Sequence, residues 1–170
     1  PHAQLTMIQV KDVVKSFDGN VVLNHISANF EDGKVNMIIG QSGSGKTVLM
    51  KSMIGLHQIN GGEIIFDTRN GQQNLAAMSE KEVRMLHREV GMLFQGAALF
   101  DSMTVQENVM YPLEMFSDMS RQEMVERARF CLSRVDMPER AHQLMPSEIS
   151  GGMQKRVAIA RAIALNPCHL

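Results

Sequence analysis

The segment Gly40–Thr47, with the sequence GQSGSGKT, constrains the fold of this chain more than any other feature. It fits the pattern G-x-x-x-x-G-K-[ST] and lies between a short apolar run, 35–39, and an apolar-rich segment, 46–56, that reads as a helix. Glycines in such a loop let the backbone wrap closely around a polyphosphate, and the helix that follows adds the positive end of its dipole. The segment therefore predicts a strand, a phosphate-binding loop and a helix in succession, within an α/β fold.

The side chains of this loop predict how a polyphosphate and Mg²⁺ would be bound. We expect Lys46 to reach the β and γ phosphates and to act in catalysis, and Thr47 to place its hydroxyl on a Mg²⁺ ion that bridges the same phosphates. The alternative is a glycine-rich turn that binds nothing, but Lys-Thr follows the last glycine in register and both flanking elements fit. The nucleotide-binding residues expected here are Gly40, Ser42, Gly43, Ser44, Gly45, Lys46, Thr47 and Val48. The loop alone leaves kinases, GTPases and motor ATPases open.

Two β-type runs precede the loop. Residues 7–17 and 20–30 are joined by Asp-Gly, a dipeptide favoured in tight hairpin turns, so we expect an antiparallel sheet. Residues 61–67 (GGEIIFD) resemble a further strand that ends before Asn-Gly, and 90–95 (VGMLFQ) is another candidate for a buried strand. The first part of the chain is therefore predicted to be rich in strands.

Three Ser/Thr-x-x-Glu spacings predict helix starts in the form of capping boxes. The pairs are Ser79 with Glu82, Thr104 with Glu107, and Ser120 with Glu123. The first helix should run to about residue 89. The region from 96 to 147 is predicted to be mostly helical.

The helix after Ser120 has an apolar face and a charged face. Pairs of opposite charge four residues apart are typical of a solvated helix surface, and a phosphate site is the less favoured alternative. We interpret the charged residues as solvated and assign them no function; they are Glu123, Glu126, Arg127, Arg129 and Arg134.

A second motif, ISGGMQKR, begins at Ile149. Ser150 can cap a helix whose first residues are glycines, which makes a second helix start suited to an anion. A plain helix start is the alternative, although glycines there destabilise a helix relative to alanine. The helix should be buried and should end before Pro167, because the residue preceding a proline is pushed out of the helical region. Two phosphate-type sites with one full nucleotide pocket suggest that two protomers share the nucleotide.

Charge and composition exclude several other classes. The 170 residues contain 17 Lys plus Arg against 18 Asp plus Glu, so no global positive field favours nucleic acid, and we expect no nucleic-acid partner. The two cysteines have no metal-type spacing, and no apolar stretch approaches the roughly 18 residues of a membrane span. We expect a cytoplasmic protein with free thiols.

The order and spacing of Gly40–Thr47, Gln95 and Ser150-Gly151-Gly152 resemble the nucleotide-binding subunit of an ATP-binding cassette (ABC) transporter. The resemblance implies a P-loop NTPase fold of the ABC ATPase type, with an antiparallel β subdomain and an α-helical subdomain. It implies that 1–95 form the β subdomain and the start of the α/β core, that 96–147 form the helical subdomain, and that 148–170 carry the signature motif and its helix.

The resemblance also implies roles for individual residues. Phe17 would stack on adenine, although a strand residue could equally belong to the core. Gln95 would reach Mg²⁺ and the attacking water and so act in catalysis. Ser150, Gly151 and Gly152 would contact the γ phosphate held by the partner protomer.

More narrowly, GMLFQGAALFDSMTVQENVMYPL and LMPSEISGGMQKRVAIARAIALNP are similar to the ATPase of the Mla-type phospholipid transport system. This resemblance implies a homodimer that sandwiches two ATP molecules, a membrane permease and an MCE-type lipid-binding protein as partners, and a peripheral location on the inner face of the cell membrane. Residues 96–116 would then form the docking surface for the permease, with Leu99, Phe100 and Met103 as its apolar contacts or as loop core.

In the family the helix ending near Pro167 is followed by a strand that finishes in Asp-Glu, the Walker B strand. We expect this chain to be truncated before that strand, to expose apolar surface and to turn over ATP poorly. No general base is assigned, and neither His169 nor Glu148 is promoted to that role. The alternatives are an ABC ATPase of another import or export system, one that acts on DNA or the ribosome, and a non-catalytic nucleotide-binding module.

Overall fold

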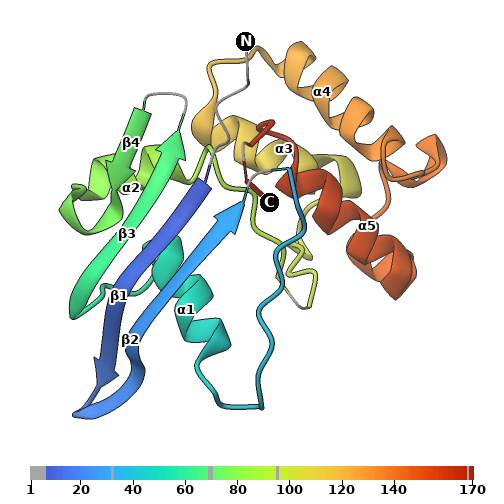
Figure 1. The fold of residues 1–170 in the computed structure, drawn as a ribbon. Helices are drawn as coiled ribbons and strands as arrows, with labels where there is room; N and C mark the ends of the chain where they lie inside the picture. The colour runs from blue at the N-terminus through green and yellow to red at the C-terminus, as the bar shows by residue number, and fades with distance from the viewer. Residues whose placement is uncertain (1–6, 32, 69–70, 95, 168) are drawn as a thin grey trace. The chain divides into compact units, whose positions relative to one another are not determined.

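A computed structural model describes residues 7–31, 33–68, 71–94, 96–167 and 169–170. The chain divides into two compact units, Pro1–His87 and Arg88–Leu170. The first unit holds a sheet and two α-helices, and the second holds three α-helices (Figure 1). None of the helices in the described part of the chain is long and apolar enough to cross a membrane.

The first unit is built on a four-stranded antiparallel sheet with the strand order β2-β1-β3-β4. The strands are β1 (Met7–Phe17), β2 (Asn20–Glu31), β3 (Gly61–Thr68) and β4 (Gly71–Asn74). The hairpin between β1 and β2 turns at Asp18 and Gly19, whose φ angles of 48° and 82° are both positive, as a type I′ turn requires. The predicted hairpin and the strand at 61–67 are therefore confirmed.

An irregularity in the β1–β2 pair decides which side chains enter the core. The register shifts between Val10 and Val13, where Asp12 has a φ of 52° and His25 on β2 has a φ of 50°. The extra residue changes the alternation of faces, so that Val10 and Val13 are both buried although they are three positions apart. The His25 ring lies 2.8 Å from an Asp12 carboxylate oxygen on the exposed side of this bulge.

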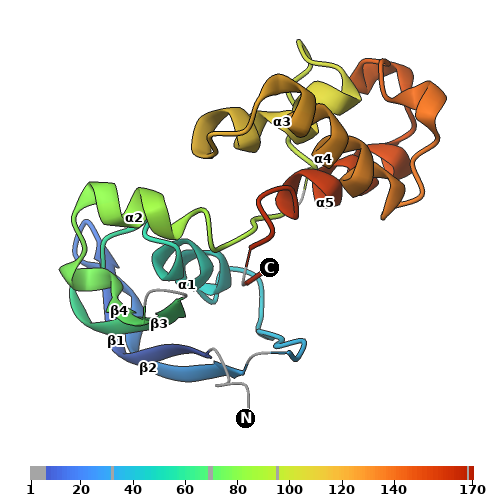
Figure 2. The same cartoon turned by 90° about the horizontal axis from the view of Figure 1, so that it is seen from above.

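Two helices lie on one face of this sheet (Figure 2). They are α1 (Lys46–Met53) and α2 (Glu80–Leu86), and a short 3₁₀ turn, η1 (Leu75–Ala77), precedes α2. Both helices are shorter than predicted, since α1 stops before Gly55, whose φ is 75°, and α2 stops at Leu86 rather than near residue 89. The core of this unit contains Val10, Val13, Leu23, Leu49, Met53, Ile64, Phe66, Leu75 and Leu86.

Two predicted strands do not form, and both expectations are wrong. Residues 35–39 have no regular structure, and Val35 and Ile39 are 94% and 84% exposed, in line with the expected exposure of apolar surface. In the segment 90–95, Val90 forms a single parallel bridge with His169, and the stretch that follows is not a strand as far as the structure describes it. Apolar composition favours a strand, but a strand exists only by hydrogen bonding to a neighbour.

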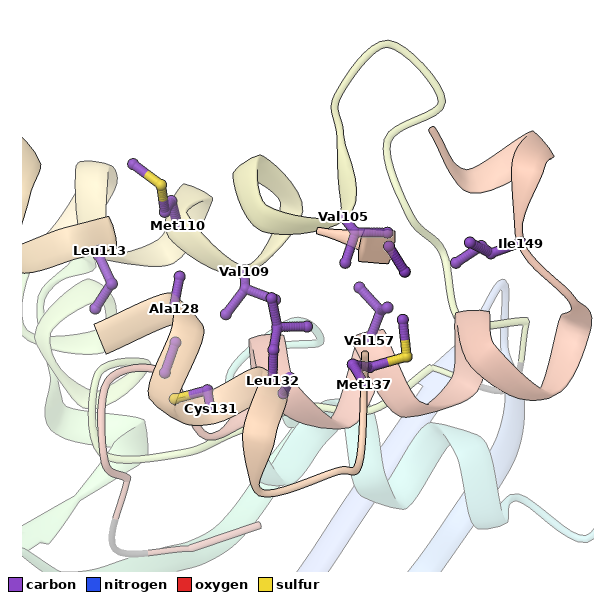
Figure 3. Packing of buried hydrophobic residues seen from close by; sticks show 13 residues of the cluster. Val105, Val109, Met110, Leu113, Ala128, Cys131, Leu132, Met137, Ile149 and Val157 are labelled. Atoms are coloured by element: carbon purple, nitrogen blue, oxygen red, sulfur yellow. The ribbon is translucent and has the colours of Figure 1, made fainter. Parts of the chain in front are cut away.

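The second unit packs three helices around one core (Figure 3). The helices are α3 (Val105–Phe116), α4 (Arg121–Ser133) and α5 (Gly151–Ala162), and two 3₁₀ turns, η2 (Glu139–Ala141) and η3 (Pro146–Glu148), join α4 to α5. Figure 3 shows Val109 of α3, Leu132 of α4 and Val157 of α5 pointing toward one another. The three predicted capping boxes are all present, at the starts of α2, α3 and α4.

Arg127 corrects the interpretation of the charged face of α4. Its side chain is half-buried, and it donates hydrogen bonds to the carbonyl oxygens of Ala164 at 2.8 Å and Ile163 at 3.0 Å. These carbonyls lie at the end of α5, where the last turn of a helix leaves acceptors unsatisfied. Arg127 is therefore a cap for another helix rather than a solvated residue, and sequence spacing within α4 could not reveal it.

Candidate nucleotide-binding site

The loop Gly40–Thr47 runs directly into α1, as predicted. Gly45 is the residue at which the helix starts, with a φ of 89°, and its carbonyl oxygen accepts the first helical hydrogen bond from the Leu49 N–H at 2.8 Å. A side chain at Gly45 would be strained by this φ, and its Cβ would lie 3.2 Å from the Val22 carbonyl oxygen on β2. The glycine therefore lets the helix begin close against the sheet.

The start of α1 differs from that of the other helices. Among the five α-helices of the described residues, α1 alone has no side chain that caps its first N–H groups; the other four are capped by Ser79, Thr104, Ser120 and Ser150. Uncapped N–H groups at a helix start, together with the helix dipole, favour an anion. The first turn of α1 is therefore suited to receiving phosphate.

The helices also differ in whether their first turns contain acidic residues. The first turns of α2, α3 and α4 each contain at least one glutamate, whereas those of α1 and α5 contain none. Glutamate in the first turn stabilises a helix but repels a phosphate. The two helices without one are those at which the sequence predicts phosphate contacts.

Lys46 closes the loop from inside. Its ammonium group donates hydrogen bonds to the carbonyl oxygens of Gly40 at 2.8 Å and Gln41 at 2.6 Å. The loop is tight at this point, because a Cβ added at Gly40 would lie 2.6 Å from the Ser44 hydroxyl oxygen. The positive charge of Lys46 is thus held at the same loop whose helix start lacks a cap.

Most of the remaining residues of the loop are open to solvent. Ser42, Gly43, Ser44 and Thr47 are exposed, and Val48 is half-buried. The described residues contain no group of three or more His, Cys, Asp or Glu that could hold a metal ion. A Mg²⁺ ion commonly takes one or two protein ligands and completes its shell with substrate phosphates and water, so the Thr47 hydroxyl fits as its protein ligand.

Phe17 lies at the end of β1 and is 38% exposed. The His57 ring meets it edge-on with ring centroids 5.3 Å apart, and the Lys15 ammonium lies 4.7 Å from its centroid. A place in the core, one of the two roles considered, is therefore wrong. The contact with His57 had no signal in the sequence, since the two residues are 40 positions apart.

Ser150 starts α5 as predicted. Its hydroxyl oxygen accepts a hydrogen bond from the Met153 N–H at 3.3 Å. Gly151 and Gly152 are exposed; a Cβ at Gly151 would meet nothing within 4 Å, and one at Gly152 would meet only the Ser150 hydroxyl, at 3.9 Å. Packing within the chain therefore does not explain why both residues lack side chains.

Gln95 lies outside the residues that the structure describes. Glu148 and His169, which were not assigned as a general base, both make structural contacts. A Glu148 carboxylate oxygen accepts a hydrogen bond from the Met145 N–H at 2.7 Å, and the His169 backbone forms hydrogen bonds with Glu89 and Gly91. These contacts give no reason to promote either residue to a general base.

Comparison with known proteins decides the family. The sequence model of the family described as ABC transporter matches residues 23–170, which is most of the chain. The chain belongs to the ABC transporter family. It is 41% identical over 162 residues to the glutamine transport ATP-binding protein GlnQ of Escherichia coli, a match that covers 95% of this chain and 65% of GlnQ.

Other relatives of this chain serve transporters with different substrates. The intermembrane phospholipid transport system ATP-binding protein MlaF of Escherichia coli is 37% identical, with 95% of this chain and 58% of MlaF covered. The methionine import ATP-binding protein MetN of Clostridium acetobutylicum is also 37% identical, with 95% and 48% covered. The chain thus spans between about half and two thirds of these relatives.

Solved structures confirm the ABC ATPase fold. The chain superposes on the dimeric structure of MJ0796, a bacterial ABC transporter cassette, with a TM-score of 0.82 and 33% identity, over 94% of this chain and 70% of that one. A post-hydrolysis dimer of the same cassette bound to ADP and Pi matches with a TM-score of 0.81 and 32% identity, over the same shares of the two chains.

Proposed function

We propose that this chain is the ATP-binding part of a subunit that hydrolyses ATP to drive an ABC transporter. The observation that carries the proposal is the start of α1, where an uncapped helix, a tight glycine loop and the Lys46 ammonium converge. ATP would be held by the N–H groups of this loop and by Lys46, with Mg²⁺ on Thr47. When bound, Mg²⁺ would neutralise charge on the phosphates.

The second part of the proposal is a two-fold dimer in which Ser150, Gly151 and Gly152 of one protomer face the nucleotide of the other. It is supported by the open space around the two glycines and by the absence of acidic residues in the first turn of α5. An interface of this kind is isologous, so one surface of the chain serves twice. ATP bound between the protomers would favour the closed dimer, and hydrolysis would release it.

The proposed cargo is phospholipid, with a permease and an MCE-type lipid-binding protein as partners at the inner face of the cell membrane. This finer proposal rests on the two segments similar to Mla-type ATPases and on the similarity to MlaF. Amino-acid import is the second candidate, since GlnQ is somewhat more similar in sequence. ATPase activity of the complex with its permease, measured with phospholipid or with amino acid and its binding protein, separates the two: stimulation by amino acid alone would reject the phospholipid assignment.

The ATPase proposal can be tested by measuring ATP turnover after replacing each of two lysines on α1. Lys46→Ala in the complete protein should lower ATP turnover at least about 100-fold, because it removes charge stabilisation worth roughly 3 kcal/mol. Lys51→Ala, at the last turn of α1, is the matched control and should leave turnover within about 2-fold, since a charge there lies at the far end of the helix. Equal turnover in both variants and the wild type would reject the proposed role of the loop.

A further inference from the structure

The loop after Gln95 contains two adjacent residues in an unfavourable backbone conformation. Ala97 has a φ of 62° and Ala98 a φ of 49°, in the left-handed region that residues with a Cβ rarely adopt. Ala97 is also buried, with 5% of its surface exposed. Two consecutive residues of this kind persist only where surrounding contacts hold them.

Arg161 of α5 supplies those contacts. One terminal nitrogen of its guanidinium donates to the Ala98 carbonyl oxygen at 2.8 Å and the other donates to the Ala97 carbonyl oxygen at 2.7 Å. The group also lies 5.9 Å from the centroid of the Phe100 ring. Partial burial lowers the pKa of Arg161, because it withdraws the guanidinium from water.

The other end of the same loop is tied to α3. The side-chain oxygen of Asn108, a fully buried residue, accepts the Phe100 N–H at 2.8 Å, and its amide nitrogen donates to the Phe100, Met103 and Thr104 carbonyl oxygens at 3.0–3.1 Å. The Phe100 ring also packs against Tyr111 of α3, with centroids 4.6 Å apart. The loop is therefore held between two helices, and Arg161 provides its side-chain hydrogen bonds with α5.

We propose that Arg161 is a positioning residue for ATP hydrolysis, which makes the loop after Gln95 move together with α5. The helix has Ser150 at its start and Arg161 near its end, so the two phosphate-related segments of this unit are joined through one rigid element. The inference rests on the proposed ATPase function and on the predicted role of Gln95. Without Arg161 the loop would lose the two hydrogen bonds that hold its strained backbone to the helix.

Arg127 offers a matched control. Like Arg161, it donates two hydrogen bonds to two consecutive carbonyl oxygens, at 2.8 and 3.0 Å, and its guanidinium lies over a phenylalanine ring, Phe130, at 5.3 Å. Its partners are at the end of α5 and not in the loop after Gln95. Removing either arginine therefore removes equivalent contacts in the same unit, but only one of them holds that loop.

The experiment measures kcat and KM for ATP, with the thermal unfolding midpoint, for Arg161→Met and Arg127→Met in the complete protein. We expect both variants to lower the unfolding midpoint by similar amounts. Arg161→Met should also lower kcat at least about 10-fold while KM for ATP changes less than about 2-fold, because the loop of Lys46 is untouched. Arg127→Met should keep kcat within about 2-fold of the wild type.

The inference would be overturned if Arg161→Met had the same kcat as the wild type, or if both variants lost kcat to the same extent. Either result would leave the ATPase proposal standing. A wild type without ATPase activity would overturn both. If Arg161→Met does not fold, Arg161→Lys decides, since it keeps the charge but not the two-pronged geometry; we expect kcat to fall at least about 3-fold at unchanged KM, and wild-type kcat would reject the role.

Discussion

The starts of α1 and α5 both contain serines and glycines, but glycine occupies the two sites for different physical reasons. At α1 the backbone itself requires them: Gly43 and Gly45 have φ angles of 81° and 89°, and a Cβ at Gly45 would lie 3.2 Å from the Val22 carbonyl oxygen. At α5 neither Gly151 nor Gly152 has a positive φ or a close neighbour beyond its own cap. The comparison teaches that the first pair of glycines serves this chain's own backbone, whereas the second pair serves no such need among the described residues, which supports the external contact proposed above.

The largest expected effect on stability is at Gly45. Gly45→Ala places a Cβ at a positive φ and against β2, and it should lower the free energy of unfolding by about 2 kcal/mol. Gly43→Ala is the control, because Gly43 has a φ of 81° but open space around it, and should lower this free energy by only about 1 kcal/mol. Urea unfolding measures both, and equal losses would show that crowding at β2 contributes nothing.

The next largest effect on stability is expected from removing the cap of α5. Ser150→Ala removes the acceptor for the Met153 N–H and should lower the free energy of unfolding by about 1 kcal/mol. Ser150→Asp keeps an acceptor and should retain most of that stability, but it places a negative charge where the proposed dimer receives phosphate. ATP turnover of Ser150→Asp should therefore fall at least about 10-fold. Full turnover in Ser150→Asp would argue against phosphate at this helix.

A smaller effect of opposite sign is expected at Gly151. Gly151→Ala should raise the free energy of unfolding by about 0.5–1 kcal/mol, because alanine favours the helix and the position has room for a Cβ. The same substitution should weaken ATP-dependent dimerisation, which sedimentation velocity in the presence of ATP would measure. A variant that is more stable and dimerises normally would remove the argument that the glycine serves an external contact.

The smallest effect concerns the helices that do have acidic residues at their starts. Hydrogen bonds from the Ser79 hydroxyl and backbone lower the pKa of Glu82 below its ordinary value of 4.5. The backbone and hydroxyl of Thr104 do the same for the pKa of Glu107, and the hydroxyl and backbone of Ser120 for that of Glu123. A lowered native pKa stabilises the fold above the unfolded value and loses that contribution as the pH falls through the native value.

Replacing the three glutamates by glutamine keeps hydrogen-bond acceptors but removes the titration. We expect the triple variant to lose less stability than the wild type between roughly pH 5 and pH 3, as followed by circular dichroism. Helices α1 and α5 have no such group in their first turns and should not contribute to the difference. Parallel acid unfolding curves for the two proteins would contradict the expectation.

Much of the candidate site was predictable because it is local. The cap at Ser150, the capping boxes and the glycine loop all join residues a few positions apart, so their spacing alone indicates their structure. The predicted strand at 35–39 failed because strand formation depends on a neighbour that no local pattern specifies. The prediction that Arg127 is solvated was wrong for the same kind of reason, since its hydrogen-bond partners lie at the end of another helix.

The sequence by itself determined where several helices and the hairpin begin and which loop is proposed to hold a triphosphate, because these properties depend on backbone groups within about four residues of the side chain that satisfies them. Only the tertiary structure decided that Phe17 is exposed beside His57, that Arg127 caps α5 and that Arg161 holds the Ala97–Ala98 backbone. The last two contacts join residues 37 and 64 positions apart, and such pairs meet only after the helices have packed.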